Sequence, residues 1–425
     1  MAGWLSAGLR APDAAPCPRA SRHGPFAQLS RQPGMLAALP LLASTLVADR
    51  LPATYNALIA RSAGSSFSSV ATVVQRPLPS VGEDEVLVRV TYAGVNGGCE
   101  TFRARGEHAF AGNKEATDFA LGAEGVGVVA AIGDGVSNVA VGDAVCFVGS
   151  AFAEFSKVKA DGLWVVPHAG PEMVGLRISA LTACAMLEQT GRLQAGETVL
   201  VTAAAGGAGH FAVQFAKLAG CTVIGTTSSP AKAAALCKLG CDYIINHRTQ
   251  VSSSPRVADG RSNFHSHARA PYTGQDVAEK LAKFAPGGLD AALEGVGGAM
   301  LQTALDALAP KGRLLQVGYI SEYPHNPDAG AESAKHEGVD TASLFWKAET
   351  VQRGEQTIYG NAWPKDFGAV AGCKDRVLAL HAEGKLVSLV DGAREFHGVS
   401  EVAEAVDYML SGAAIGKVVV KIGEE

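Results

Sequence analysis

A glycine-rich turn between a buried strand and an amphipathic helix is the segment best suited to chemistry. Residues 198–209 read TVLVTAAAGGAG, and a helix pattern follows at once. Glycine lets the backbone approach a pyrophosphate, and the free N–H groups and positive dipole end of the helix favour phosphate. This strand–turn–helix context predicts a dinucleotide site, although Ala204 replaces the first glycine of the usual G-x-G-x-x-G pattern. The expected binding residues are Gly206, Gly207, Ala208 and Gly209.

The end of the second strand in this series bears on the choice between NADH and NADPH. NAD-binding enzymes carry Asp or Glu there, which binds the 2′-hydroxyl of the ribose. Residues 225–229 read GTTSS, without an acid, and Lys232 follows one turn into the next helix. Small hydroxyls and a lysine suit a 2′-phosphate, so we predict NADPH as the cofactor. The alternative for Lys232 is an exposed lysine at a helix start.

The elements around the turn predict an α/β fold with two parts. Before Pro171, short strands and Gly-rich turns favour a twisted β-barrel or sandwich. From residue 198 onward, strands and helices alternate, which predicts a parallel sheet with right-handed crossovers. The expected strands are 198–202, 222–226, 243–245, 291–294 and 313–317. The expected helices are 172–189, 207–219, 231–239, 275–284 and 299–308.

Composition excludes several classes of protein. The chain has 425 residues, 48% of them hydrophobic, which is enough for two domains. A net charge of −5 leaves no basic excess for nucleic acid. No apolar run reaches the roughly 18–20 residues that a membrane span needs. The eight cysteines form no CxxC pair or zinc-ribbon spacing, so we expect small buried thiols and no metal.

The first 47 residues have an unusual composition. They contain four arginines and a single acid, Asp13, and are rich in Ala, Ser and Pro. This is typical of a transit peptide for a chloroplast or mitochondrion. The alternative is a disordered leader before a true start at Met35, with a cytoplasmic protein. We expect a fluorescent fusion of residues 1–60 to enter an organelle, and a fusion that stays in the cytosol would contradict this prediction.

Several further motifs accompany the glycine-rich turn. They include AGVN at 93–96, GAEG at 122–125, EGVGG at 294–298 and VGYIS at 317–321. As a set they resemble the zinc-independent branch of the medium-chain dehydrogenase/reductases, and within it the quinone oxidoreductases and prostaglandin reductases of type 3. The resemblance covers about residues 70–421. It implies a GroES-like β-barrel catalytic domain, a Rossmann domain and an active-site cleft between them.

This resemblance implies a division of the chain into four parts. Residues 1–60 are expected to be a leader outside the fold, and residues 68–186 the first part of the GroES-like catalytic domain. Residues 187–330 are the expected Rossmann NADPH-binding domain, with a polar surface insertion at 251–271. Residues 331–425 are expected to supply the last Rossmann elements and return to the catalytic domain. We also expect a homodimer.

The resemblance separates this chain from zinc alcohol dehydrogenases. Those enzymes carry Gly-His-Glu, whose His is a metal ligand, where this chain has Ala123 before Glu124. The ligand cysteine is replaced around Asn96. Without a Lewis acid, ionising an alcohol is difficult. The expected substrate is therefore an enone, 2-alkenal or quinone, with the enolate stabilised by hydrogen bonds and water as the final proton source.

The resemblance also assigns roles to residues. Asn96 is expected to line the nicotinamide site, and Tyr319 or Tyr323 to hydrogen-bond to the ribose or the substrate oxygen. The alternatives are a capping or turn role for Asn96 and plain packing for the tyrosines. The other expected cofactor contacts are Thr182 at the carboxamide, Ser228 near the phosphates, His247 at the adenine or a phosphate, Gly295 through its backbone, Val317 and Tyr323 at the nicotinamide half, and Gly360 and Asn361 on its far side.

The leading functional hypothesis is an NADPH-dependent enone reductase. Quinone reduction and trans-enoyl reduction are alternatives within the enzymes. A non-catalytic NADPH-binding protein is the alternative outside them. The substrate-contacting loops are the least matched part of the resemblance, so the choice stays open at this stage.

Overall fold

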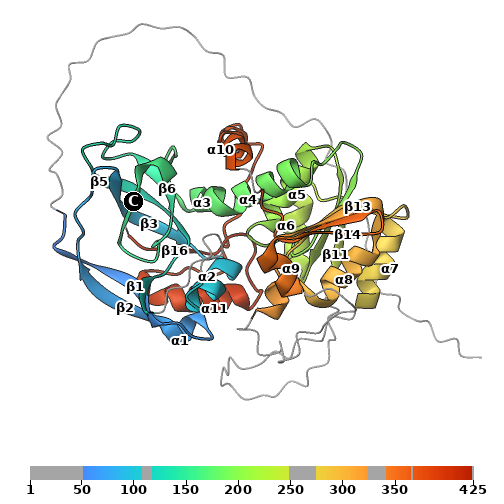
Figure 1. Ribbon diagram of the computed structural model, residues 1–425, viewed down its shortest axis with the longest axis horizontal. Helices are drawn as coiled ribbons and strands as arrows, with labels where there is room; N and C mark the ends of the chain where they lie inside the picture. The colour runs from blue at the N-terminus through green and yellow to red at the C-terminus, as the bar shows by residue number, and fades with distance from the viewer. Residues whose placement is uncertain (1–50, 108–116, 248–273, 324–340, 365–366, 424–425) are drawn as a thin grey trace, which may run out of the picture.

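The computed structural model describes residues 51–107, 117–247, 274–323, 341–364 and 367–423. The expected insertion at 251–271 and residues 1–50 of the expected leader lie outside these ranges. Figure 1 shows two halves side by side, with β1 to β6 in one and β9 to β15 in the other. No helix in the described ranges is long and apolar enough to cross a membrane.

The first half contains two antiparallel sheets. One has three strands in the order β2-β1-β4, and the other has six, in the order β16-β3-β5-β6-β8 with β7 paired to β3. The strands are β1 (Thr54–Ser62), β2 (Ala71–Pro77), β3 (Glu85–Gly94), β4 (Thr117–Ala120), β5 (Glu124–Ile132), β6 (Ala144–Val148), β7 (Phe155–Lys159), β8 (Trp164–Val165) and β16 (Val419–Lys421). The helices are α1 (Phe67–Val70), α2 (Gly97–Ala104) and α11 (Val402–Leu410).

The end of the chain returns to this first half, as predicted. Strand β16 pairs antiparallel with β3, and Val419 lies opposite Gly94. This pairing brings the residues just before β16 close to the start of α2, although the two segments are far apart in the sequence.

The folded chain begins earlier than the sequence predicts. Strand β1 starts at Thr54, so the prediction of a leader outside the fold up to residue 60 is wrong for residues 54–60. Leu58 and Ala60 are buried and pack in one cluster with Phe67, Phe119 and other residues of this half. The arginine-rich composition that indicates a leader ends before this strand, and the apolar residues of β1 belong to the core.

The second half is the predicted parallel sheet. Its order is β11-β10-β9-β12-β13-β15-β14. Without the antiparallel edge strand β14, this is the 3-2-1-4-5-6 order of a Rossmann fold. The strands are β9 (Thr198–Val201), β10 (Thr222–Thr227), β11 (Tyr243–Asn246), β12 (Leu289–Glu294), β13 (Leu308–Gln316), β14 (Thr350–Arg353) and β15 (Gln356–Tyr359). The helices are α5 (Gly209–Leu218), α6 (Pro230–Lys238), α7 (Gly274–Phe284), α8 (Gly298–Asp306), α9 (Thr341–Lys347) and α10 (Phe367–Ala382).

A helical segment from Pro171 to Thr190 connects the two halves (Figure 1). It contains α3 (Pro171–Gly175) and α4 (Leu181–Cys184), each followed by a stretch of wider π-type turns. Its buried residues pack against β9, α5 and α10 in the largest hydrophobic cluster. This packing places α4, and with it Thr182, between the halves.

Candidate functional site

The glycine-rich turn lies at the carboxyl edge of the parallel sheet. Strand order reverses between β9 and β12, and ligands of such sheets bind at this point. A side-chain carbon at position 209 would lie 2.4 Å from the carbonyl oxygen of Ala203, so glycine is required there. The N–H groups of Gly207, Ala208 and Gly209 donate no hydrogen bond within the described ranges. The start of α5 therefore offers free amide donors of the kind that bind a pyrophosphate.

His210 holds the turn in place. Its Nε2 accepts a hydrogen bond from the Leu389 N–H at 3.1 Å, so the ring proton is on Nδ1, which donates to the Gly206 carbonyl at 2.9 Å. Burial lowers the pKa of His210 to about 4. The imidazole is therefore neutral near pH 7 and ties the turn to the segment that leads back to the first half.

The end of β10 presents the residues expected at the 2′-phosphate. Thr227 is buried, and its hydroxyl has no hydrogen-bond partner within the described ranges. Lys232 Nζ lies 3.3 Å from the Ser228 hydroxyl and donates to the Gly412 carbonyl at 2.6 Å. This edge therefore holds one ammonium and two small hydroxyls, a donor set that fits a phosphate. His247 follows β11 and is half-buried, with its N–H bonded to the Thr227 carbonyl.

A buried ammonium occupies the interface between the halves. Lys417 is 1% exposed, and its Nζ lies 2.5 Å from Glu124 Oε1 and 2.7 Å from Asn96 Oδ1. The Asn96 Nδ2 group donates to the same Glu124 oxygen at 2.9 Å, and the other oxygen accepts the Ile178 N–H. The Lys417 stem lies 3.6 Å from a side-chain carbon built at Gly207, so this network touches the glycine-rich turn.

This network holds the side chain of Asn96 in place. Its side-chain amide is bonded to Lys417 and Glu124 and does not cap the helix that follows, which rules out the capping alternative. Asn96 is held rigidly at the start of α2. Its expected role at the nicotinamide stays a prediction.

A second buried carboxyl lies one helical turn further on. Glu100 is 1% exposed, and neither of its carboxyl oxygens has a hydrogen-bond partner among the residues that the structure describes. Burial raises its pKa to about 8, against the opposing charge of Lys417 and the nearby N–H groups of Asn96 and Ala123. The Glu100 carboxyl is therefore mostly protonated near pH 7.

The shifted pKa predicts how stability depends on pH. The unfolded chain ionises Glu100 near pH 4.5, whereas the folded chain does so near pH 8, so the folded state loses stability as pH rises between these values. We expect Glu100→Gln to remove this loss. At pH 8.5 its free energy of unfolding should exceed that of the wild type by on the order of 3 kcal/mol. Urea unfolding across pH 5–9 measures the difference, with exposed Glu355→Gln as the control. A constant difference across that range would contradict the prediction.

Loops after β12 and β13 supply the other expected residues. The N–H groups of Ile320 and Ser321 bond to the carbonyls of Gly295 and Val296, which joins the two loops. Glu294 stabilises the first of these loops, because its carboxylate accepts hydrogen bonds from the N–H groups of residues 296 and 297 and from the Thr202 hydroxyl. Burial raises the pKa of Glu294 to about 7. Val317 and Gly295 thus lie together at the edge of the sheet.

Tyr323 links these loops to the first half. Its hydroxyl lies 3.0 Å from side-chain carbons built at Gly98 and at Gly318, so both glycines make room for it. The structure therefore brings Tyr323 and Gly318 close to α2, which begins after Asn96. Thr182 is buried on α4, and no hydrogen bond within the described ranges ties its side chain to these loops.

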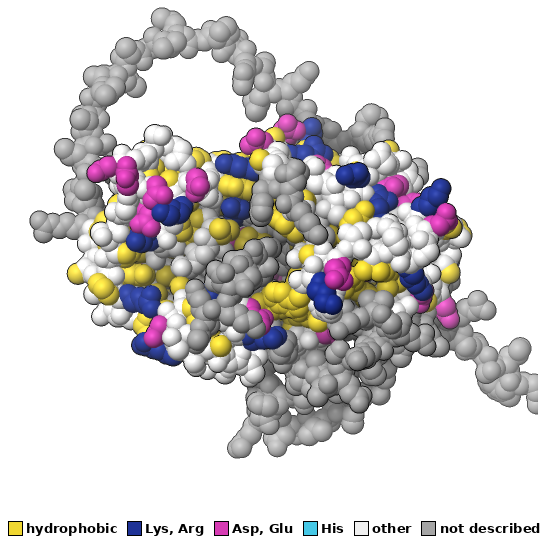
Figure 2. Space-filling view, in the orientation of Figure 1, with side chains coloured by type: hydrophobic (Ala, Val, Ile, Leu, Met, Phe, Trp, Pro, Cys, Tyr) yellow, Lys and Arg dark blue, Asp and Glu magenta, His cyan; other side chains and the backbone are white. Residues whose placement is uncertain are grey.

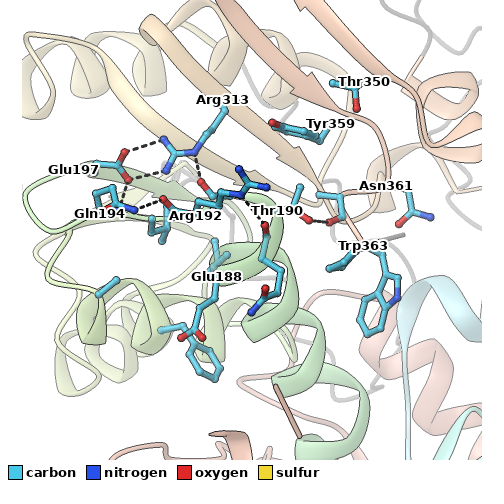
Figure 3. A pocket seen from close by; sticks show the side chains of 18 of the residues that line it. Glu188, Thr190, Arg192, Gln194, Glu197, Arg313, Thr350, Tyr359, Asn361 and Trp363 are labelled. Atoms are coloured by element: carbon cyan, nitrogen blue, oxygen red, sulfur yellow. Dashed lines mark hydrogen bonds and ion pairs between the residues drawn. The ribbon is translucent and has the colours of Figure 1, made fainter. Parts of the chain in front are cut away.

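Gly360 and Asn361 come directly after β15. They border an open groove of about 1150 Å³, together with Arg313, Glu197 and residues 187–194 (Figure 3). None of the other candidate residues lines this groove. Two of the three arginines that line it are paired with carboxylates, Arg313 with Glu197 and Arg376 with Glu188. The loop after β15 also lies beside the end of β13, because the Ala362 N–H donates to the Gln316 carbonyl at 2.8 Å, and the expected contact of Gly360 and Asn361 with the nicotinamide half stays a prediction.

Several residues of the site carry no role in the sequence-based prediction. They are Glu100, Glu124, His210, Glu294 and Lys417. A signal existed for two of them, because Glu124 opens a strand that is otherwise apolar and Lys417 precedes the apolar strand at the end of the chain. Single charges at such places are rarely buried unless paired.

Two known protein families match parts of this chain. Residues 82–168 match the alcohol dehydrogenase GroES-like domain, and residues 207–353 match the zinc-binding dehydrogenase domain. The chain is 34% identical over 383 residues to prostaglandin reductase-3 of Mus musculus, covering 88% of this chain and 90% of that protein. The chain belongs to the medium-chain dehydrogenase/reductase family. The GroES-like and Rossmann parts predicted from its motifs are confirmed.

Other members of the family extend this similarity. A probable quinone oxidoreductase of Leishmania amazonensis is 35% identical over 374 residues, covering 87% of this chain and 99% of that protein. The quinone oxidoreductase of Escherichia coli, solved in complex with NADPH, shares the fold with a TM-score of 0.65 and 20% identity, covering 86% of this chain and 99% of that one. The chain is thus similar to NAD(P)H-dependent reductases over most of its length.

The donor set does not fit a catalytic zinc ion. Alanine at position 123 has no ligating atom. The neighbouring carboxylate of Glu124 and the Asn96 oxygen are both bonded to the Lys417 ammonium, a fixed cation that would repel a second one. The match to the zinc-binding dehydrogenase family model therefore does not carry zinc chemistry to this chain.

Proposed function

We propose that this protein is an NADPH-dependent reductase of activated carbon–carbon double bonds, such as enones and 2-alkenals, that acts without zinc. The network of Lys417, Glu124 and Asn96 carries this proposal, because it fills the place where the resemblance puts metal ligands. The free amides of the glycine-rich turn and the ammonium of Lys232 support the choice of a phosphorylated dinucleotide.

The residues of this chain have three tasks in such a reaction. Bound NADPH would supply a hydride. The start of α5 would hold the pyrophosphate, and the end of β10 would hold the 2′-phosphate through Ser228 and Lys232. The tyrosines after β13 would donate hydrogen bonds that stabilise the negative charge gained by an acceptor oxygen. Because no metal ion assists, an acceptor whose carbon takes hydride directly is favoured over a simple alcohol.

Quinone reduction is the second candidate. It is supported by the relative from Leishmania amazonensis, whose name includes that activity and of which this chain covers 99%. Quinones, like enones, conjugate the double bond with a carbonyl, so the same hydrogen bonds would serve both.

One assay separates these functions. Purified protein is incubated with NADPH and a panel of enones, quinones and enoyl thioesters, and absorbance of the reduced nicotinamide is followed. We expect consumption with enones or 2-alkenals to be fastest. Faster consumption with quinones or enoyl thioesters would favour those activities, and tight NADPH binding without consumption would favour a binding protein.

A further inference from the structure

A cluster of aromatic side chains joins the two halves beside the candidate site. Phe102 of α2 is at its centre, with ring-centroid distances of 4.7 Å to Trp346, 5.1 Å to Tyr323 and 6.1 Å to Tyr319. Phe345 completes the cluster. Four of the five rings are buried, and Trp346 is the exposed one, at 42%. Figure 2 shows hydrophobic side chains near the middle of this face, where α9 lies in Figure 1.

One polar contact orders this cluster. The indole Nε1–H of Trp346 donates to the Tyr319 hydroxyl oxygen at 2.7 Å. An indole N–H is a donor only, so Tyr319 must be the acceptor in this bond. The hydroxyl proton of Tyr319 is then directed away from Trp346 and is free to bond to another oxygen.

The hydroxyl proton of Tyr319 is available to a ligand. Its residue is 4% exposed, and within the described ranges its hydroxyl proton has no acceptor. A buried donor that lacks an acceptor is costly, and a ligand oxygen would remove the cost. Burial also raises the pKa of Tyr319, which keeps the phenol protonated and able to donate.

The backbone places this donor near the cofactor edge. Tyr319 follows β13 by three residues, and its Cβ lies 2.9 Å from a side-chain carbon built at Gly297, in the loop after β12. Tyr323 is a weaker choice for the same task, because its hydroxyl is packed against Gly98 and Gly318. The pair of Tyr319 and Trp346 therefore presents the better-placed donor.

We infer that Trp346 is a positioning residue that orients the Tyr319 hydroxyl to donate a hydrogen bond to the carbonyl oxygen of the acceptor. This inference rests on the proposed function and names the residues that recognise the conjugated carbonyl. As the β-carbon takes a hydride, charge moves to the carbonyl oxygen, where the hydrogen bond strengthens. Tyr319 keeps its proton, and water supplies the proton that the α-carbon takes up.

A double-mutant cycle tests the inference. Tyr319→Phe and Trp346→Phe each keep a ring in the cluster and remove one polar group. Calorimetry measures the affinity of the NADP⁺-loaded protein for a saturated ketone, which has no carbon–carbon double bond to reduce. Steady-state kinetics measure kcat/KM for enone reduction. We expect each single variant to lose about tenfold in ketone affinity and in kcat/KM. Because Trp346 acts through Tyr319, the double variant should be no worse than Tyr319→Phe.

The controls separate this inference from its premise. Trp363→Phe, in the groove of Figure 3, should leave ketone affinity and kinetics unchanged, and thermal unfolding checks that all variants fold. An additive cycle, or full ketone affinity in Trp346→Phe, would overturn the inference. If none of the acceptors led the wild-type protein to consume NADPH, that result would instead contradict the proposed function.

Discussion

Lys417→Met should lower the free energy of unfolding by about 3–5 kcal/mol. The side chains of Lys417 and Glu124 are 1% and 0% exposed, so removing the ammonium leaves a buried carboxylate without its counter-charge. Asn96 would also lose the partner of its side-chain oxygen. Urea unfolding at pH 7 measures the change, and the variant should lose enone reduction along with stability because α2 begins directly after Asn96.

Two further variants test whether an unpaired buried charge causes the loss of stability in Lys417→Met. Lys385→Met removes an exposed ion pair with Glu383, and should cost less than about 1 kcal/mol. Glu124→Gln combined with Lys417→Met removes both buried charges and should recover much of the loss. If the double variant were as unstable as Lys417→Met, the unpaired charge would not be the reason.

Lys232→Ala should weaken NADPH binding about 10- to 100-fold and leave NADH binding nearly unchanged. A charged hydrogen bond to phosphate is worth about 1.5–3 kcal/mol, and NADH lacks the 2′-phosphate. In the structure Lys232 Nζ is bonded to the Gly412 carbonyl, so binding would exchange a neutral acceptor for a phosphate. Fluorescence titration with both cofactors measures the two affinities.

Lys238→Ala is the matched control, since Lys238 is exposed in the last turn of the same helix. It should leave both affinities unchanged. Equal losses for NADPH and NADH in Lys232→Ala would show that Lys232 supports the fold through Gly412 rather than selecting the phosphate.

Local patterns predict the Rossmann half well. Strand β9, for example, has three buried apolar residues in a row after Thr198, because helices cover both faces of a parallel sheet. The glycine-rich turn follows from the same local pattern, since position 209 must lack a side chain where α5 packs on Ala203. These features depend on neighbours in the sequence, so the sequence alone reveals them.

Features formed by distant residues are harder to predict. Lys417 and Asn96 are 321 positions apart, and only the pairing of β16 with β3 brings them together. Asn96 alone therefore suggests a turn or a ligand contact rather than a buried network. Trp346 lies on the short helix α9, whose sequence has no clear period, and its bond to Tyr319 depends on how that helix packs.

The most direct test of the account follows the hydride itself. The protein is incubated in the presence of a metal chelator with an enone and NADPH deuterated at the transferable position, using each of the two stereoisomers in turn. We expect one stereoisomer to give a saturated ketone with deuterium on the β-carbon, at a rate that the chelator does not change. Product that lacks the label with both stereoisomers, or activity that the chelator abolishes and zinc restores, would contradict metal-free hydride transfer from NADPH by this protein.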